Sequence, residues 1–324
     1  MRATKTSSGV WSVRVCGLVV FGLVVATGLL GVCEGAGQGK DTPQKSFATP
    51  EKAVEALGVA YQKGDRQTMA AILGDTGWRL VFSGDPVIDR YESAWFLSLY
   101  REGHEVDPES ESRAVLTLGK DGQPYPIPIV KTGAHWRFDS SEGHEDLLSR
   151  RMSKNELSAL NVVVAFVAAQ RAYHQAPQRG DGVKEYAQKF KSTPGQHDGL
   201  YWEEPVGQAA GPLAGLADLA GKEGYRPAKA GEPRIYRGYL YKPLTAQGPQ
   251  APGGARDYVV NGRMTAGFAL VAFPIRYGIS GVLTFLVNQD GVVYQKDLGP
   301  KTVEVGWSMT RFDPDSTWTK GQAN

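Results

Sequence analysis

The chain contains very little cysteine. Its only two cysteines among 324 residues are Cys16 and Cys33, and both lie close to the N-terminus. Beyond residue 33 the sequence therefore offers no thiol, which excludes disulfide bridges, thiol chemistry and cysteine-based zinc sites there. The folded part has to derive its stability from buried apolar surface.

An excess of charge of either sign is also absent. The chain has 36 lysines and arginines against 34 acidic residues, and Arg2, Lys5 and Arg14 lie in residues 1–33, which leaves 33 basic residues against the same 34. Nucleic acids and anionic membranes attract proteins through basic patches of some size. We therefore expect no nucleic-acid partner, and contact with a membrane only through the N-terminal segment.

Catalytic motifs are lacking as well. Gly278-Ile279-Ser280-Gly281 is one residue out of register for a nucleophile elbow, so Ser280 is expected in a turn. His104-Glu105 and His144-Glu145 both lack the second histidine that a zinc-binding helix places four positions on. The sequence also has no phosphate-cradling glycine loop in front of a helix. It thus predicts no catalytic residue, no metal site and no cofactor, and leaves enzymatic activity uncertain.

The sequence does contain one long apolar run, VCGLVVFGLVVATGLLGVC at residues 15–33, between a basic start and the small residues Gly35 and Ala36. This order is typical of a secretory signal, so residues 1–36 are predicted to be a signal segment and residues 37–48 a linker. The alternative is a retained membrane anchor, since the run is about long enough to cross a bilayer.

Leu30-Gly31-Val32-Cys33 resembles the lipobox of a bacterial lipoprotein, in which a lipid is attached to the cysteine. Val32 departs from the small residue expected before that cysteine. Cys33 is thus a candidate lipidation site and a candidate membrane anchor. The predicted location is outside the cytoplasm, in the periplasm or the extracellular space, either released or anchored through Cys33.

Residues 49–150 are predicted to form helices followed by strands. The residues that mark three helices are Thr49-Pro50 with Gly64, Asp65 with Gly74, and the apolar positions Tyr91, Trp95 and Leu99. From Ala114 to Phe138 apolar and polar residues alternate, which favours antiparallel strands. This order of helices and a curved sheet resembles the cone-shaped nuclear-transport-factor-2-like fold.

Residues 151–324 are predicted to pack a long helix on an antiparallel sheet. The helix spans residues 154–174, with Ser153 as its cap and Glu156 completing a capping box. LTFLV and VVYQK flank a turn at residues 288–291, as in a β-hairpin.

Two short helices are expected between the long helix and the sheet, at residues 181–190 and within GQAAGPLAGLADLAG. The fold class is therefore α+β, with two domains that are each long enough to bury a core. NELSALNVVVAFVAAQRAYH and AFPIRYGISGVLTFLVNQDGVVY resemble a type IV pilin-like headgroup. Arg150, Arg151 and Lys154 stand where an assembling pilin has an apolar helical half, so the resemblance implies the fold without fibre assembly.

Motifs along nearly the whole chain after the N-terminal segment resemble the exported bacterial family catalogued as domain of unknown function 2950. They are Phe47-Ala48-Thr49-Pro50, Trp136-Arg137-Phe138-Asp139, Arg150-Arg151 with Asn155-Glu156, Tyr258-Val259-Val260-Asn261-Gly262, and Val287-Asn288-Gln289-Asp290-Gly291. The resemblance implies an exported protein and no particular activity.

Two functional hypotheses remain open. The first is a non-enzymatic envelope protein that binds an envelope protein or a cell-wall component through exposed aromatic residues. Its candidate contact residues, which burial in the core would explain equally well, are Trp202, Tyr236, Tyr239 and Tyr241. The second is a small-molecule carrier or enzyme with a pocket in the first domain. Its candidate polar groups are Asp75, Asp89, His104, His135 and Asp139.

Overall fold

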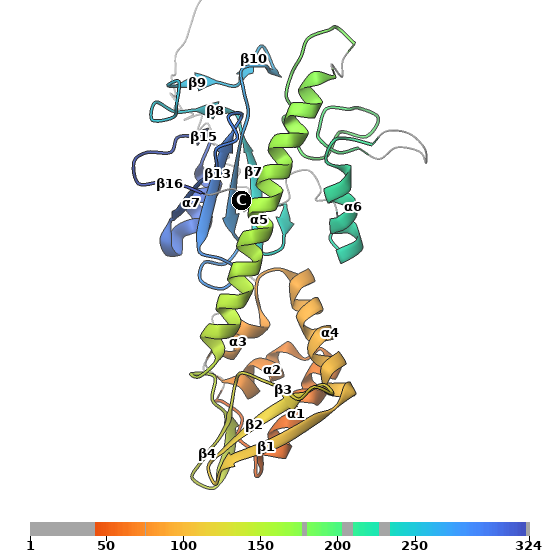
Figure 1. The fold of residues 1–324 in the computed structure, drawn as a ribbon, viewed down its shortest axis with the longest axis vertical. Coiled ribbons are helices and arrows are strands. Elements are labelled where there is room, and N and C mark those ends of the chain that lie inside the picture. The colour runs from red at the N-terminus through yellow and green to blue at the C-terminus, as the bar shows by residue number, and fades with distance from the viewer. Residues whose placement is uncertain (1–42, 75, 177–179, 203–209, 227–233, 322–324) are drawn as a thin grey trace, which may run out of the picture. The chain divides into compact units, whose positions relative to one another are not determined.

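The computed structural model describes residues 43–74, 76–176, 180–202, 210–226 and 234–321, and its ribbon is drawn in Figure 1. The predicted signal segment, Cys33, Asp75 and residues 37–42 of the predicted linker lie outside this part. The described chain is α+β, as predicted. None of its described helices has both the length and the apolar character that crossing a membrane requires.

Four helices open the fold, and their ends follow the capping residues. They are α1 (Pro50–Lys63), α2 (Arg66–Leu73), α3 (Gly77–Val81) and α4 (Pro86–Glu102). Thr49 accepts a hydrogen bond from the backbone N–H of Lys52 at 3.3 Å, and Asp65 accepts one from Thr68 at 3.0 Å. Gly64 ends α1 with a φ of 64°. The three predicted helices are confirmed, and α3 is an addition.

An antiparallel sheet packs against these helices. Its strands are β1 (His104–Ser110), β2 (Arg113–Leu118), β3 (Gln123–Pro124), β4 (Ile129–Thr132) and β5 (His135–Phe138). β2 lies between β1 and β4, β5 pairs with β4, and β3 pairs with β2. Leu116 of β2 and Phe138 of β5 are fully buried in one apolar cluster with Leu57 of α1. We call residues 43–143 the first half and this cluster the first core.

α5 (His144–Gln175) is one helix of 32 residues. The predicted start at Ser153 is wrong, because Ser153 lies inside the helix. Glu156 closes no capping box and instead accepts backbone hydrogen bonds from Val282 and Leu283 at 2.9 and 3.1 Å. The helix starts earlier because its first turns are held by tertiary packing, in which Leu148 is buried in the first core.

The second half, residues 144–321, is built on a six-stranded antiparallel sheet in the order β16-β14-β13-β12-β7-β6. Its strands are β6 (Ile235–Tyr236), β7 (Tyr239–Leu244), β12 (Ala269–Pro274), β13 (Leu283–Asn288), β14 (Tyr294–Asp297) and β16 (Thr319–Lys320). The predicted hairpin is confirmed by the pairing of β13 with β14, where the N–H of Gly291 donates to the carbonyl of Asn288 at 3.0 Å.

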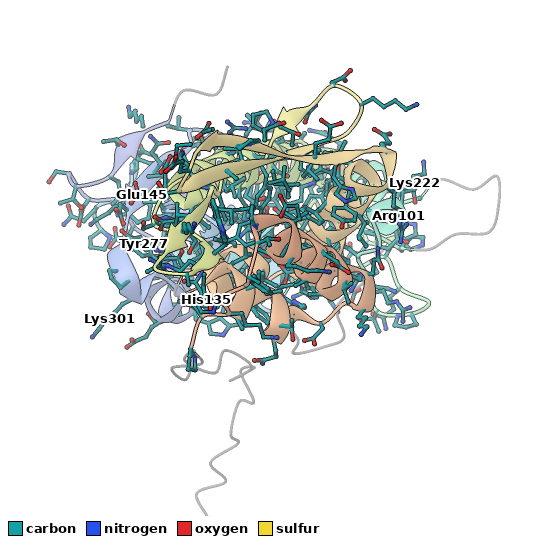
Figure 2. All side chains as sticks on the ribbon, turned by 90° about the horizontal axis from the view of Figure 1, so that it is seen from below. Arg101, His135, Glu145, Lys222, Tyr277 and Lys301 are labelled. Atoms are coloured by element: carbon teal, nitrogen blue, oxygen red, sulfur yellow. The ribbon has the colours of Figure 1, made fainter. Side chains whose placement is uncertain are left out.

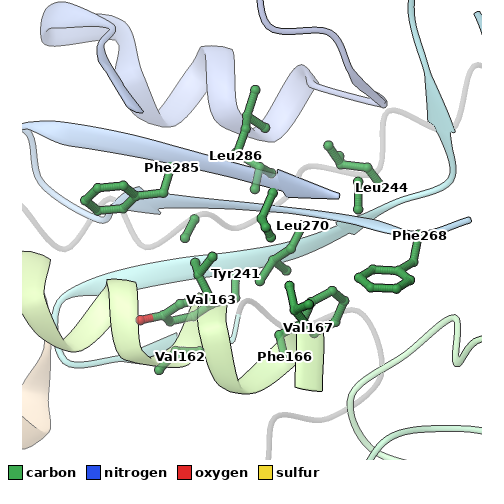
Figure 3. Packing of buried hydrophobic residues seen from close by; sticks show 14 of the residues in the cluster. Val162, Val163, Phe166, Val167, Tyr241, Leu244, Phe268, Leu270, Phe285 and Leu286 are labelled. Atoms are coloured by element: carbon green, nitrogen blue, oxygen red, sulfur yellow. The ribbon is translucent and has the colours of Figure 1, made fainter. Parts of the chain in front are cut away.

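Helices cover both faces of this sheet. α5 contacts β12 and β13 on one face, so the predicted packing of the long helix on the sheet is confirmed (Figure 1). Figure 3 shows Val163 and Phe166 of α5 in the same apolar core as Leu270 and Phe285 of the sheet. On the other face lies α7 (Thr302–Ser308), whose Gly306 is so close to β12 that an added Cβ would be 2.6 Å from a ring carbon of Phe273.

Short elements fill the remaining described segments. They are α6 (Ala214–Glu223), the 3-10 helix η1 (Gly299–Lys301), β8 (Ala246–Gln247), β9 (Arg256–Asp257), β10 (Val259–Val260), β11 (Arg263–Met264) and β15 (Arg311–Phe312). α6 confirms one of the two predicted short helices. The helix predicted at residues 181–190 is wrong, because Tyr186 forms a β-bridge with Met264 and Glu185 pairs with Arg263 at 3.1 Å. Tertiary pairing overrides the local helical preference there.

Arginine side chains connect the two halves. Arg151 of α5 is only 7% exposed, pairs with Glu92 at 2.6 Å and donates to the carbonyl of Arg79 at 2.9 Å. Arg79 in turn donates to the carbonyl of Gly278 at 3.0 Å. Ile279, in the same turn, is buried in the first core. The turn before β13 is thus tied to the helices of the first half.

Candidate binding groove

The polar residues predicted for a pocket in the first half do not form one site. Asp89 is buried in α4, where it accepts a hydrogen bond from the backbone N–H of Ser83 at 2.9 Å and pairs with Arg66. Asp139 accepts from the backbone N–H of Ser141 at 3.2 Å in a local turn. Both carboxylates therefore serve the local structure.

The two histidines of that prediction are exposed at separate places. His104 begins β1 and stacks on Tyr100 with ring centroids 3.7 Å apart. His135 begins β5 and lies at the surface (Figure 2). Among the described residues no group of three or more His, Cys, Asp or Glu side chains is arranged to hold a metal ion.

Aromatic rings fill much of the interior of the first half. Tyr61 stacks on Phe96 with centroids 4.0 Å apart, and Tyr125 contacts both Phe96 and Phe138 edge-on at 5.8 and 6.3 Å. Burial raises the pKa of Tyr61 to about 12, so its hydroxyl stays protonated at neutral pH. Trp95, by contrast, is 52% exposed. Tyr61 and Phe138 thus fill part of the interior of the first half, while a hollow of about 550 Å³ at its surface is lined by Tyr100 and His104.

Another hollow lies beside α6 and is lined by residues of both halves. It has a volume of about 1040 Å³ and is bounded by α6, by β6 and β7 at the edge of the sheet, and by Asp85 with the start of α4. We call it the groove. Its wall along α6 is apolar, because Leu213, Leu216, Ala217 and Ala220 share one face of a helical repeat.

The apolar face of α6 is only partly buried. Leu213, just before the helix, belongs to the core of the second half, and Leu216 packs against that core. No residue of α6, all of which the structure describes, is fully buried. An amphipathic helix of a globular protein normally buries its apolar face against a core. The groove lies between α6 and the sheet, and Leu216, Ala217, Ile235 and Tyr236, on its two sides, are partly exposed.

Local sequence fixes the position of α6. At its start, Gly211 lies against the loop before it, since an added Cβ would be 2.5 Å from the carbonyl oxygen of Leu200 and 2.8 Å from the Trp202 ring. At its end, Gly224 takes a φ of 97°, which a glycine adopts without strain. Each end of α6 therefore depends on a glycine, Gly211 for lack of space and Gly224 for its backbone conformation.

The floor of the groove is held by Asp85, which is fully buried. One carboxylate oxygen caps α4 by accepting from the backbone N–H groups of Val87 and Ile88 at 2.9 and 3.3 Å. The other accepts from the Tyr225 hydroxyl at 2.7 Å and from the backbone N–H of Gly238 at 2.9 Å. Asp85 thus joins three segments that are far apart in the sequence.

The turn between β6 and β7 is fixed by the same network. Arg237 has a φ of 46° and donates its backbone N–H to the Tyr225 hydroxyl at 3.0 Å, while its side chain pairs with Glu223 at the end of α6. Burial, and then the charge of Asp85, raises the pKa of Tyr225 well above its usual range. Tyr225 therefore remains a neutral hydroxyl that both donates and accepts.

The four predicted aromatic contact residues divide around this groove. Tyr236 and Tyr241 line it, although Tyr241 is only 4% exposed. Trp202 is half-buried beside the groove and stacks on His197 with centroids 4.3 Å apart. Tyr239 is 0% exposed, and its hydroxyl donates to the carbonyl of Leu283 at 2.9 Å. Tyr239 is thus a core residue, the alternative that the sequence left open, and only Tyr236 and Tyr241 face the groove.

The sequence did not identify Asp85, Tyr225 and Arg234 as parts of this site. Asp85-Pro86 does indicate the start of a helix, because aspartate followed by proline is typical of a helix N-terminus. Arg234 is half-buried at the groove, with its guanidinium 5.6 Å from the centre of the Phe190 ring. Burial lowers the pKa of Arg234. Nothing in its sequence neighbourhood indicates this environment.

Comparison with known proteins gives a family but no characterised relative. A family model described as "Protein of unknown function (DUF2950)" matches residues 44–320. No curated protein and no solved structure matches the chain. The resemblances to a pilin headgroup and to the nuclear-transport-factor-2-like fold therefore stay predictions.

Proposed function

This chain belongs to the family of proteins of unknown function DUF2950, and from that premise we propose that it is an exported, non-enzymatic binding protein of the cell envelope that takes an apolar ligand in the groove. The export part is supported by the basic start, the apolar run and the small residues within positions 1–36. The binding part is supported by the groove beside α6.

The single observation that carries the binding proposal is the hollow between the apolar face of α6 and the edge of the sheet, with partly exposed apolar side chains on both sides. Ligand sites for small molecules are concave, mostly apolar and typically about 300–1,000 Å³ in volume. The groove, at about 1040 Å³, has that size, and aliphatic side chains of α6 face Tyr236 and Tyr241 across it. A ligand that fills it would bury apolar surface at roughly 25 cal/mol for each Å² removed from water.

The polar groups at the groove suit binding better than catalysis. Both carboxylate oxygens of Asp85 are occupied by hydrogen bonds, so this carboxylate is not available as a general base. Burial raises the pKa of Tyr225 and Tyr241 well above the usual value, so these hydroxyls stay protonated. The Tyr225 hydroxyl is already held by Asp85 and by the N–H of Arg237, so the apolar walls of the groove would provide the affinity for a ligand.

Two glycines of α6 offer a matched test. Gly221 lines the groove, Gly215 does not, and a side chain added at either position would meet open space. We expect Gly221→Trp to fill part of the groove and to weaken binding of the apolar fluorophore N-phenyl-1-naphthylamine by tenfold or more, and Gly215→Trp to leave it unchanged. Neither change should unfold α6, because glycine is the weakest helix former after proline.

The measurement is a fluorescence titration of the full chain and both variants, with circular dichroism to verify folding. Fluorophore bound by the apolar run at residues 15–33 contributes equally to all three proteins, so the difference between the variants reports on the groove alone. Equal binding by folded Gly221→Trp and Gly215→Trp would refute the proposal.

A further inference from the structure

The groove is lined by one partly buried cation, Arg234, whose surroundings favour an anionic partner. Arg234 is half-buried, and the structure records no ion pair between it and any described residue. Its guanidinium lies over Phe190 at 5.6 Å from the ring centre. A partly desolvated guanidinium normally pairs with a carboxylate or a phosphate, because burial is costly for an uncompensated charge.

Two neighbouring carboxylates, those of Asp85 and Glu223, are already committed to other groups. Asp85 is used by Tyr225 and Gly238, and Glu223 pairs with Arg237 at 3.1 Å. Of the described residues that line the groove, four are cationic and two are acidic: Lys191, Lys222, Arg226 and Arg234, against Asp85 and Asp218. The groove therefore favours a ligand that carries negative charge.

An apolar path leads along α6 past this cation. Leu213 and Leu216 stand on the α6 side, Ile235 and Tyr241 stand on the sheet side, and Ile235 directly follows Arg234 in the chain. A ligand with an extended apolar chain can lie between these walls and bring a single anionic head to the guanidinium. A purely polar anion would not cover the apolar side chains, and a neutral hydrocarbon would bring no negative charge to Arg234.

Building on the proposed function, we infer that the groove binds a single-chain amphiphile with an anionic head, a long-chain carboxylate of the fatty-acid type, whose head pairs with Arg234. The planar guanidinium can hold both oxygens of a carboxylate through two parallel N–H···O bonds. The occupant is a free amphiphile rather than a membrane surface, because the groove is a concave site for one chain and Arg234 is half-buried in it.

The test compares dodecanoate with dodecanol as competitors that displace N-phenyl-1-naphthylamine from the full chain. Dodecanoate should displace the fluorophore at a concentration roughly tenfold lower than dodecanol, as expected for one charge-assisted hydrogen-bonded pair. Arg234→Gln should abolish that preference and leave the affinity for dodecanol unchanged. Arg234→Lys should retain part of the preference, since the charge remains without the planar fork.

Arg226→Gln is the matched control, because Arg226 also lines the groove but is exposed. It removes the same charge and should keep the preference for dodecanoate at physiological salt. Circular dichroism shows whether each variant folds.

The other outcomes separate the two proposals. Equal displacement by dodecanoate and dodecanol, with fluorophore binding still lost in Gly221→Trp, would overturn the anion assignment and leave the groove as a binding site. A preference that persists in folded Arg234→Gln, or displacement by anionic phospholipid vesicles but not by dodecanoate, would overturn it as well. Fluorophore binding that Gly221→Trp does not reduce would overturn the proposed function itself.

Discussion

Replacing Asp85 with alanine should destabilise the protein far more than the loss of an ordinary helix cap. The cap of α4 contributes about 1 kcal/mol to the free energy of unfolding. The substitution would also leave the Tyr225 hydroxyl and the Gly238 N–H without their acceptor. Each donor left unsatisfied in a buried place costs about 1–3 kcal/mol. The expected total for Asp85→Ala is therefore about 3–7 kcal/mol.

Asp65 provides the matched control for this prediction. It caps α2 by accepting from the backbone N–H of Thr68 at 3.0 Å, but it is exposed. Asp65→Ala should cost only about 1 kcal/mol. Asp85→Asn should fall between the two alanine variants, because an amide oxygen can still cap α4 while the amide NH₂ would face the N–H of Gly238.

Urea unfolding followed by circular dichroism measures these differences. With an m value of about 3 kcal/mol/M, Asp85→Ala should lower the midpoint by roughly 1 M or more, and Asp65→Ala by about 0.3 M. Equal midpoints for the two alanine variants would refute the reasoning, because Asp85 would then act as a cap and not as the link between α4, Tyr225 and the turn at Gly238.

Two further predictions concern the N-terminus and the pH dependence. An alkaline phosphatase that is active only outside the cytoplasm should be active when residues 1–36 are fused ahead of it. Replacing Val19, Val20 and Leu23 with Asp should abolish the phosphatase activity. An inactive wild-type fusion would contradict export. Burial lowers the pKa of His174 below 6.5 in the folded protein. At mildly acidic pH the histidine therefore binds a proton more readily in the unfolded chain than in the folded one. The contribution of neutral His174 to stability is complete above pH 6.5 and is lost as the pH falls toward the folded pKa. Between about pH 7 and about pH 5 the melting temperature of the wild type should fall further than that of His174→Gln, and equal falls would show that His174 does not contribute.

Elements with local start and stop residues could be predicted from the sequence. α1 and α2 begin at Thr49 and Asp65 and end at Gly64 and Gly74, because caps and glycines act within a few residues of chain. The hairpin of β13 and β14 was found for the same reason. Its turn is closed by local bonds, in which Asn288 accepts from the backbone N–H of Asp290 at 3.1 Å.

Elements that depend on distant partners were predicted poorly. Ser153 and Glu156 looked like a helix start, yet α5 already runs through them, because Leu148 and Arg151 find their partners in the first half. Residues 181–190 have a helical pattern, but Tyr186 pairs with Met264, far along the chain. A pattern that is read within one segment contains no information about such contacts.

The candidate site shows the same division. Tyr236 and Tyr241 were selected as aromatic residues, and they line the groove. Asp85 and Arg234 matter because of what surrounds them in space. Asp85 accepts hydrogen bonds from two donors of other segments, and Arg234 lies near the Phe190 ring and apolar side chains of the groove. The short helix α6 was expected from the sequence, but not the hollow that lies between it and the sheet.

The membership of Ile279 in the first core bears on how the protein is made. This residue lies in the turn before β13, yet the other buried members of its cluster all lie between residues 53 and 148 and are synthesised far earlier. The first core therefore lacks one of its members until the ribosome has passed that turn. Completion of both cores waits for the same late stretch of translation, and the nascent chain stays incompletely packed until most of it has emerged.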